Sequence, residues 1–189
     1  MLGYPMGTKR VAVCAMMAVL MLAGSAAAEE LLFRTSMGDF TVVTYDTTPT
    51  AVDHFMQDVI SDRFDNVVIT HSAPTPLVSG GSGDIVWAGS VAKDETLVSD
   101  TNPYGWVHTE AFDSVQNLAE AGEPPVRGTI TMAQTGDGHY SNGFFFNLTD
   151  NPTLAAPEDS NVAAFTTFGE VTEGLEVLDA IFALPTERV

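Results

Sequence analysis

Residues 127–133 have the sequence RGTITMA, and residues 143–147 have the sequence GFFFN. Both segments are rich in β-branched or aromatic residues, which favour strands, and a polar, glycine-containing loop separates them. The second segment is too apolar to face water on both sides of a sheet. The two segments therefore predict two strands of a largely buried β-sheet.

The segments upstream predict a hairpin followed by a helix. Residues 31–36 and 40–45 are rich in strand-forming residues, and residues 37–39 between them have turn chemistry. Thr48 is a candidate N-cap, and Pro49 suits the first helical position. The next apolar residues recur at helical spacing and predict one buried stripe: Val52, Phe55, Met56, Val59 and Ile60.

The rest of the chain predicts more strands and a second helix. Residues 67–69 and 163–171 are expected strands, and residues 84–125 are expected to form long surface loops with one short strand. A final helix is expected from about Thr172, with Leu175 and Leu178 on its apolar face. Because no βαβ alternation is present, the pattern predicts a mostly β fold, an antiparallel sheet or barrel with two flanking helices.

Composition excludes several classes of protein. The 189 residues include 25 acidic and 7 basic ones, for a formal net charge of −18. So acidic a chain does not suit nucleic acid, whose phosphates require a basic face, or an anionic membrane surface. One cysteine cannot form an internal disulfide or a cysteine-rich zinc site. Apolar residues make up 45% of the chain, and 11 Phe can build one core.

The N-terminus has the features of a secretory signal peptide. Lys9 and Arg10 precede an apolar run at 11–23, and residues 24–28 are small. We therefore expect cleavage after Ala28, a domain over residues 29–189, export to a periplasm or the outside, and no membrane attachment after cleavage. An uncleaved membrane anchor is the alternative, but the run is shorter than the ~20 residues of a spanning helix.

In order and spacing, the segments resemble the cyclophilin family of peptidyl-prolyl isomerases from about Leu31 to Leu184. The matching stretches are 35–40 (TSMGDF), 48–55 (TPTAVDHF), 127–133 with 143–147, and 165–179 (FTTFGEVTEGLEVLD). The resemblance implies a closed eight-stranded antiparallel barrel capped by two α-helices. In the family, a closing strand follows the last helix. Here only residues 185–189 remain, so that strand is expected to be missing.

The family's catalytic segment, F-H-R-V-I-P-G-F-M-I-Q-G-G, is altered in this chain. We aligned it on Gly80 and Gly81. The family's catalytic Arg then becomes His71, and its pocket Phe becomes Pro76. The pocket Met becomes Leu77, the Gln that supports the Arg becomes Ser79, and the Gln before the later Phe pair becomes Gly143.

The resemblance also implies a substrate site. His71 is the expected catalytic residue, and an apolar recess for the prolyl ring is expected from Leu77, Phe145, Leu154 and Phe165. Ala133 and Gln134 are expected beside the substrate backbone, with Ser79 and Gly143 as altered neighbours. The expected partners are proline-containing segments of unfolded or exported proteins, and the protein is expected to be a monomer without cofactor or metal.

The chemistry explains why the change at His71 matters. An X-Pro bond has a rotation barrier of ~18–20 kcal/mol, and no nucleophile or metal is needed to lower it. A donor aimed at the twisted prolyl nitrogen helps in the transition state alone. Histidine is shorter than arginine and, with a reference pKa of ~6.5, is mostly neutral at pH 7. We therefore expect proline recognition with weak isomerase activity.

Alternatives remain open from the sequence. His71 is either a substrate contact or a strand-end histidine, and Phe145 and Phe165 are either pocket walls or core residues. The protein is then a weak isomerase, a non-catalytic proline-peptide-binding or chaperone-like module, or a domain without a ligand. We expect His54 to be solvated, and His139 has no second metal ligand near it in the sequence.

Overall fold

The computed structural model describes residues 13–17, 28–76, 82–102, 104–108, 120, 122–134, 138–154 and 165–186. The strands are β1 (Val13–Met17), β2 (Glu30–Thr35), β3 (Gly38–Thr44), β4 (Val67–Val68), β5 (His71–Pro76), β6 (Ser82–Ala88), β7 (Val91–Lys93), β8 (Trp106–His108), β9 (Thr129–Gln134), β10 (Tyr140–Asn147) and β11 (Thr167–Glu173). The helices are α1 (Pro49–Ile60), α2 (Leu175–Phe182) and the short 3-10 turns η1 (Glu95–Leu97) and η2 (Pro152–Leu154).

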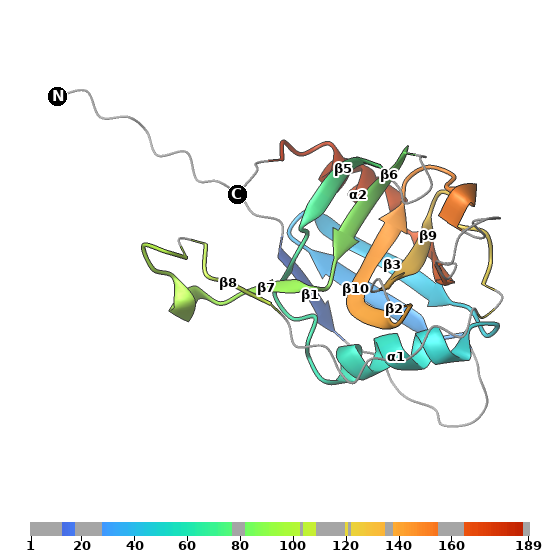
Figure 1. The fold of residues 1–189 in the computed structure, drawn as a ribbon, viewed down its shortest axis with the longest axis horizontal. Helices are drawn as coiled ribbons and strands as arrows, with labels where there is room; N and C mark the ends of the chain where they lie inside the picture. The colour runs from blue at the N-terminus through green and yellow to red at the C-terminus, as the bar shows by residue number, and fades with distance from the viewer. Residues whose placement is uncertain are drawn as a thin grey trace.

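All strands belong to one curled antiparallel sheet, in the order β5-β6-β10-β9-β11-β3-β2-β1-β4-β7-β8 (Figure 1). Helix α1 packs against β10, and helix α2 packs against β3, β5 and β6. The predicted mostly β fold with two helices is thus confirmed. The expected closed ring of eight strands differs from the described sheet, which has eleven strands and ends at β5 and β8.

Additional strands explain this difference. The hairpin of β7 and β8 extends away from the rounded body (Figure 1). Strand β1 pairs with both β2 and β4, so β2 has a partner on each side within the described sheet. A segment of the predicted leader, β1, therefore lies beside the first strand of the predicted domain. Whether this leader is cleaved stays a prediction.

Most of the expected elements form where the sequence placed them. The hairpin is β2 and β3, the first helix begins at Pro49, and the two quoted segments become β9 and β10. The prediction for residues 84–125 was wrong for its first part, because β6, β7 and β8 lie within or across this range. Loop-like glycines at 81, 83 and 89 surround a short apolar run, which conceals β6 in the sequence.

The main core lies between the concave side of the sheet and the helices. Phe33 stacks on Phe40 with ring centroids 4.9 Å apart, and Phe55 of α1 meets Phe144 of β10 edge-on at 5.2 Å. Phe144 and Phe146 both belong to this core, whereas Phe145 between them does not. Alternate residues of a strand point to opposite faces, so Phe145 lies on the other face of the sheet.

The start of helix α1 is capped by a distant carboxylate. Thr48 is the N-cap residue, as predicted, but its side chain makes no capping hydrogen bond. Instead, the carboxylate of Glu120 accepts hydrogen bonds from the amides of Thr50 and Ala51, at 2.9 and 3.1 Å. An anion at this position satisfies amides that have no partner within the helix and complements the helix dipole.

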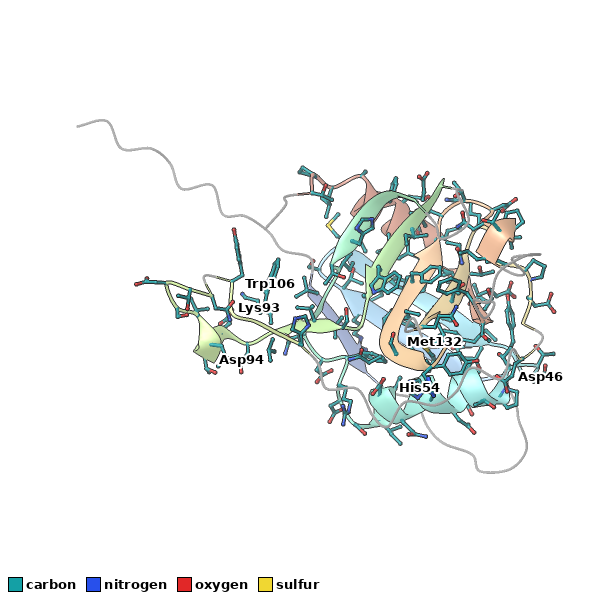
Figure 2. All side chains as sticks on the ribbon, in the orientation of Figure 1. Asp46, His54, Lys93, Asp94, Trp106 and Met132 are labelled. Atoms are coloured by element: carbon teal, nitrogen blue, oxygen red, sulfur yellow. The ribbon has the colours of Figure 1, made fainter. Side chains whose placement is uncertain are left out.

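Helix α1 also buries two titratable side chains. The prediction that His54, which lies on α1 (Figure 2), is solvated was wrong, because its side chain is 2% exposed. Asp58, one turn later, is 1% exposed. His54 Nε2 lies 3.3 Å from the carbonyl oxygen of Ser141, and its ring lies 5.9 Å from that of Tyr140. The helix is therefore covered by β10 beyond its predicted apolar stripe.

Burial shifts the pKa values of both groups. It lowers the pKa of His54, and it raises the pKa of Asp58 to about 6 against the opposing effect of Arg63, whose Nε lies 3.7 Å away.

No helix in the described part of the chain is long and apolar enough to span a membrane.

We predict that Asp58→Asn changes the pH dependence of stability. The pKa of Asp58 in the folded protein is raised from 3.8 to about 6. The protonated carboxyl therefore stabilises the folded state below pH 3.8, and this stabilisation is lost as the pH rises towards 6. Relative to the parent, D58N should therefore gain stability between pH 4 and pH 7, on the order of 3 kcal/mol at 1.36 kcal/mol per pKa unit. Urea unfolding at several pH values measures this difference. A difference that does not change with pH contradicts the prediction.

Candidate functional site

A row of side chains crosses four strands on the face of the sheet opposite the main core. His71 of β5 is paired with Trp87 of β6, and Trp87 is paired with Phe145 of β10. Phe145 is in turn paired with Thr131 of β9. Directly paired residues of antiparallel strands share a face with Cβ atoms about 4.5–5.5 Å apart. The strand register thus places His71 at one end of an aromatic row.

A second apolar cluster includes two residues of this row, Trp87 and Phe145. It is separate from the main core and consists of the buried residues Ile85, Phe145 and Leu154 with the half-buried Trp87 and Phe165. The Trp87 indole stacks on Phe145 with centroids 5.4 Å apart and planes 18° apart, and Phe165 meets Phe145 edge-on at 5.8 Å. The structure therefore brings together Phe145, Leu154 and Phe165, three of the four residues expected to form the recess.

Two of the residues expected to form the recess, Phe145 and Leu154, are buried within the protein. Phe145 is 1% exposed and Leu154 is 3% exposed, so neither presents much surface to a ligand. Trp87 and Phe165 are the partly exposed members of the cluster. A ligand that approaches this face of the folded chain therefore meets Trp87 and Phe165 first.

The space beside Gly143 is occupied by the indole of Trp87. A Cβ atom at Gly143 would lie 3.1 Å from Trp87 Nε1, 3.2 Å from the Cβ of Ala133 and 3.3 Å from Ser141 Oγ. These distances are tighter than ordinary van der Waals contact. A longer side chain at position 143, such as the Gln of the resembling family, needs Trp87 to move.

The other expected site residues lie at the edge of this cluster or outside the described residues. His71 has an exposed side chain at the start of β5, and the amide of Thr70 before it donates to the carbonyl of Trp87 at 3.0 Å. Ala133 is fully buried, and Gln134 is half-buried at the end of β9. Leu77 and Ser79 lie outside the described residues.

A buried polar network supports the row from the side of β9. The amide nitrogen of Asn147 donates to Thr129 Oγ1 and Thr131 Oγ1, at 3.0 and 2.9 Å, and its oxygen accepts from the amide of Asn151 at 2.8 Å. Thr131 Oγ1 also lies 3.1 Å from Thr167 Oγ1. Buried polar groups with partners of this kind fix a single arrangement of the strands.

Sequence reasoning missed Trp87 and Ile85 as members of the site. The alignment on Gly80 and Gly81 assigned the pocket positions to Leu77 and Ser79, whereas the structure pairs β5 (His71–Pro76) with β6 (Ser82–Ala88). This pairing brings Trp87 opposite His71. The alternation of residues 85–88 (IVWA), with Val86 and Ala88 in the main core, is the sequence signal that could have identified the strand.

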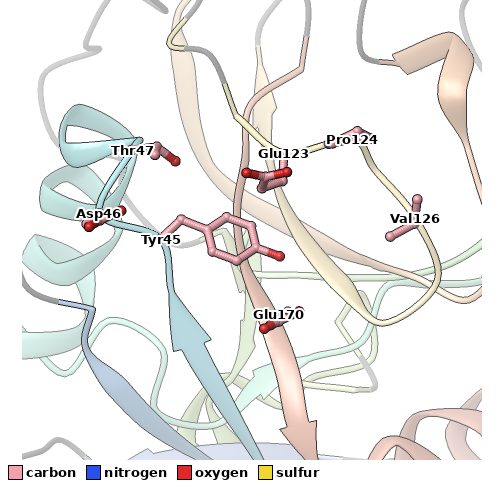
Figure 3. Close-up of a pocket in the computed structure, with 7 residues that line it drawn as sticks. All are labelled: Tyr45, Asp46, Thr47, Glu123, Pro124, Val126 and Glu170. Carbon is pink, nitrogen blue, oxygen red and sulfur yellow. The ribbon is translucent and has the colours of Figure 1, made fainter.

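A pocket of about 370 Å³ is lined by other residues, from the end of β3, the segment before β9, and β11 (Figure 3). Its lining includes Tyr45 and the carboxylates of Asp46, Glu123 and Glu170. Burial, followed by the nearby charges of Glu170 and Glu123, raises the pKa of Tyr45 to about 12. In the described ranges, no group of three or more His, Cys, Asp or Glu side chains is arranged to hold a metal ion.

Comparison with known proteins agrees with the fold and the order of the motifs. Residues 31–189 match the family model described as "Cyclophilin type peptidyl-prolyl cis-trans isomerase/CLD". The chain is 28% identical over 161 residues to peptidyl-prolyl cis-trans isomerase A of Dickeya dadantii, covering 84% of this chain and 74% of the relative. It is 28% identical over 159 residues to isomerase B of Escherichia coli, covering 82% and 85%.

Solved structures share the fold at lower sequence identity. A cyclophilin-type isomerase of Cryptosporidium parvum superposes with a TM-score of 0.59 at 18% identity, covering 86% of this chain and 88% of that one. A second structure of that protein, in the presence of the dipeptide Ala-Pro, has a TM-score of 0.58 at 18% identity and covers 85% and 89%.

We predict that side chains at position 143 displace Trp87 in proportion to their size. Gly143→Ala should need only a small shift of the indole, whereas Gly143→Gln should expose it and cost about 1–3 kcal/mol, as overpacking does. In a Trp106→Phe background, only Trp87 contributes indole fluorescence. Its emission should stay nearly unchanged in G143A and shift to the red in G143Q. Identical emission and stability in the two variants contradict the prediction.

Proposed function

Because the chain belongs to the cyclophilin-type peptidyl-prolyl cis-trans isomerase family, we propose that it is an exported protein that binds proline-containing segments and isomerises X-Pro bonds slowly. The observation that carries this proposal is the position of His71. His71 is the first residue of β5 and has an exposed side chain. It is paired with Trp87 of β6, next to the other residues of the second apolar cluster.

The binding part of the proposal rests on the exposed apolar surface. Proline has an apolar ring and no amide hydrogen, so a binding site for it needs an apolar contact and donors or acceptors for the flanking backbone. Trp87 and Phe165 offer such a surface. The Ala-Pro dipeptide studied with the Cryptosporidium protein is a ligand of the same chemical class.

The low rate follows from the donor that His71 provides. A transition-state donor must reach the prolyl nitrogen as the amide twists, and removal of one such donor costs about 10²–10³ in rate. A neutral imidazole is a weaker and shorter donor than a guanidinium. The neighbour opposite His71 is an indole, which has one N–H donor and no acceptor, whereas a glutamine amide has a carbonyl oxygen that can accept from an arginine.

Export is the third part of the proposal. It rests on the basic residues Lys9 and Arg10, the apolar run at 11–23 and the small residues before Glu29. A strongly acidic chain with a net charge of −18 repels other copies of itself, which favours solubility after export.

We predict that the protein accelerates proline-limited refolding of a test protein about 10²–10³-fold less than an Arg-bearing member of the family. His71→Arg alone should not restore the full rate, because the Gln that supports the arginine in the family is Ser79 in this chain. The readout is the amplitude and rate of the slow refolding phase. Fast catalysis by the unmodified chain that is abolished by His71→Ala would show that imidazole replaces guanidinium well.

A non-catalytic proline-peptide-binding or chaperone-like module is the second candidate function, and the altered residues His71, Ser79 and Gly143 favour it. The same assay distinguishes the two. Binding of an Ala-Pro peptide, followed by chemical shifts, without any acceleration of refolding identifies a binding module.

We also predict that the exported form begins at Glu29. N-terminal sequencing of the protein recovered outside the cytoplasm measures this directly. Ala28→Tyr, directly before the cleavage site, should accumulate uncleaved precursor, because this position requires a small residue. Ala27→Tyr is the matched control, since the position between the two small residues tolerates large side chains. Export of a chain that keeps Met1 contradicts the prediction.

A further inference from the structure

The half-buried Trp87 has no counterpart among the site residues that the resemblance implied, yet it occupies the centre of the candidate site. It is paired with His71 on one side and Phe145 on the other. Its indole is stacked on Phe145 with centroids 5.4 Å apart, and Phe145 itself is 1% exposed. One face of the indole is therefore used inside the protein, and the residue as a whole is only partly buried.

We propose that Trp87 is the residue that recognises proline in this protein, and that the prolyl ring of the substrate packs on the outer surface of its indole rather than in a slot over Phe145. This inference rests on the proposed function, because it assigns the binding of proline-containing segments to one residue. The buried members of the cluster, Ile85, Phe145 and Leu154, then act as the support of the indole.

The chemistry of proline suits this surface. Indole presents a broad electron-rich face, and the ring C–H groups next to the prolyl nitrogen are polarised by the amide. Proline-rich segments are bound in aromatic-lined grooves by other domains for the same reason, since their extended conformation costs little entropy on binding. His71 lies beside the indole in the same row, where its ring can contact the backbone next to the proline.

The surroundings of Trp87 are built to hold it in this position. Its carbonyl accepts a hydrogen bond from the amide of Thr70 at 3.0 Å, in addition to the pairing of β6 with β5 and β10. Gly143 leaves room for the indole, because a Cβ atom there would come within 3.1 Å of Nε1. A binding surface that is fixed in advance loses little entropy when the peptide docks.

The chain offers a matched control for the test. It contains two tryptophans, Trp87 and Trp106, and Trp106 is also half-buried and packs against an aromatic ring, that of Tyr104 at 5.2 Å. Trp106 lies on β8 in the hairpin that extends from the body (Figure 1). Substitutions at Trp106 therefore change an equivalent side chain away from the site.

The experiment uses the full chain and the peptide Ala-Ala-Pro-Ala, with Ala-Ala-Ala-Ala as the control peptide. Binding is measured by peptide chemical shifts in the parent, Trp87→Leu, Trp87→Phe and Trp106→Leu. We expect W87L to lose affinity about ten-fold or more, W87F to lose less, and W106L to bind like the parent. In Trp106→Phe, saturation with the proline peptide should change the emission of Trp87, and the control peptide should not.

Three other outcomes would overturn the inference. If W87L binds the proline peptide as well as the parent or more tightly, the slot over Phe145 is the recognition site, and the inference fails while the proposed function stands. If W87L does not fold, an unchanged Trp87 emission at saturation in W106F overturns the inference. If the parent does not bind the proline peptide at all, the proposed function fails, and the inference fails with it.

Discussion

The alternation of side chains along β10 is the constraint on which the rest of the structure depends. Phe144 and Phe146 enter the main core beneath the helices, whereas Phe145 enters the second cluster on the opposite face. A shift of this strand by one residue would move Phe144 and Phe146 out of the main core and turn Phe145 into it. The pairings of β10 with β9 and with β6 therefore determine both the packing of the main core and the geometry of the candidate site.

Polar contacts at the ends of β9 and β10 hold that register. The amide of Gly128 donates to the carbonyl of Asn147 at 2.7 Å, and the Asn147 side chain bonds to both Thr129 and Thr131. Arg127 donates to the carbonyl of Leu148 at 2.7 Å and to the carboxylate of Asp179 on α2. The second helix is thus tied to the same strand pair. An exposed ion pair of this kind contributes little energy, and its geometric role is the larger one.

The parts of the fold that could be predicted are those with dense, regular apolar patterns. The helix from Pro49 and the strands around Ile130 and Phe145 are of this kind, and the order of their motifs was sufficient to indicate the family. The position of β6 was missed, because the alignment on Gly80 and Gly81 directed attention to Leu77 and Ser79, whereas the strand paired with β5 begins at Ser82 and places Trp87 opposite His71. The burial of His54 was missed for a different reason. It depends on the carbonyl of Ser141, which no local pattern contains.

The residues at positions 71, 87 and 143 form one physical unit. Trp87 fills the space that a side chain at 143 would need, and it stands opposite the position where the family carries its arginine. An indole contacts a prolyl ring almost equally in the planar and the twisted amide, since the ring moves little as the bond rotates. Interactions that are equal in the ground state and the transition state raise affinity without raising the turnover rate. In the function proposed above, a site with His71 and Trp87 in place of a charged donor therefore favours recognition over catalysis, on the β9–β10 strand pair that the fold retains.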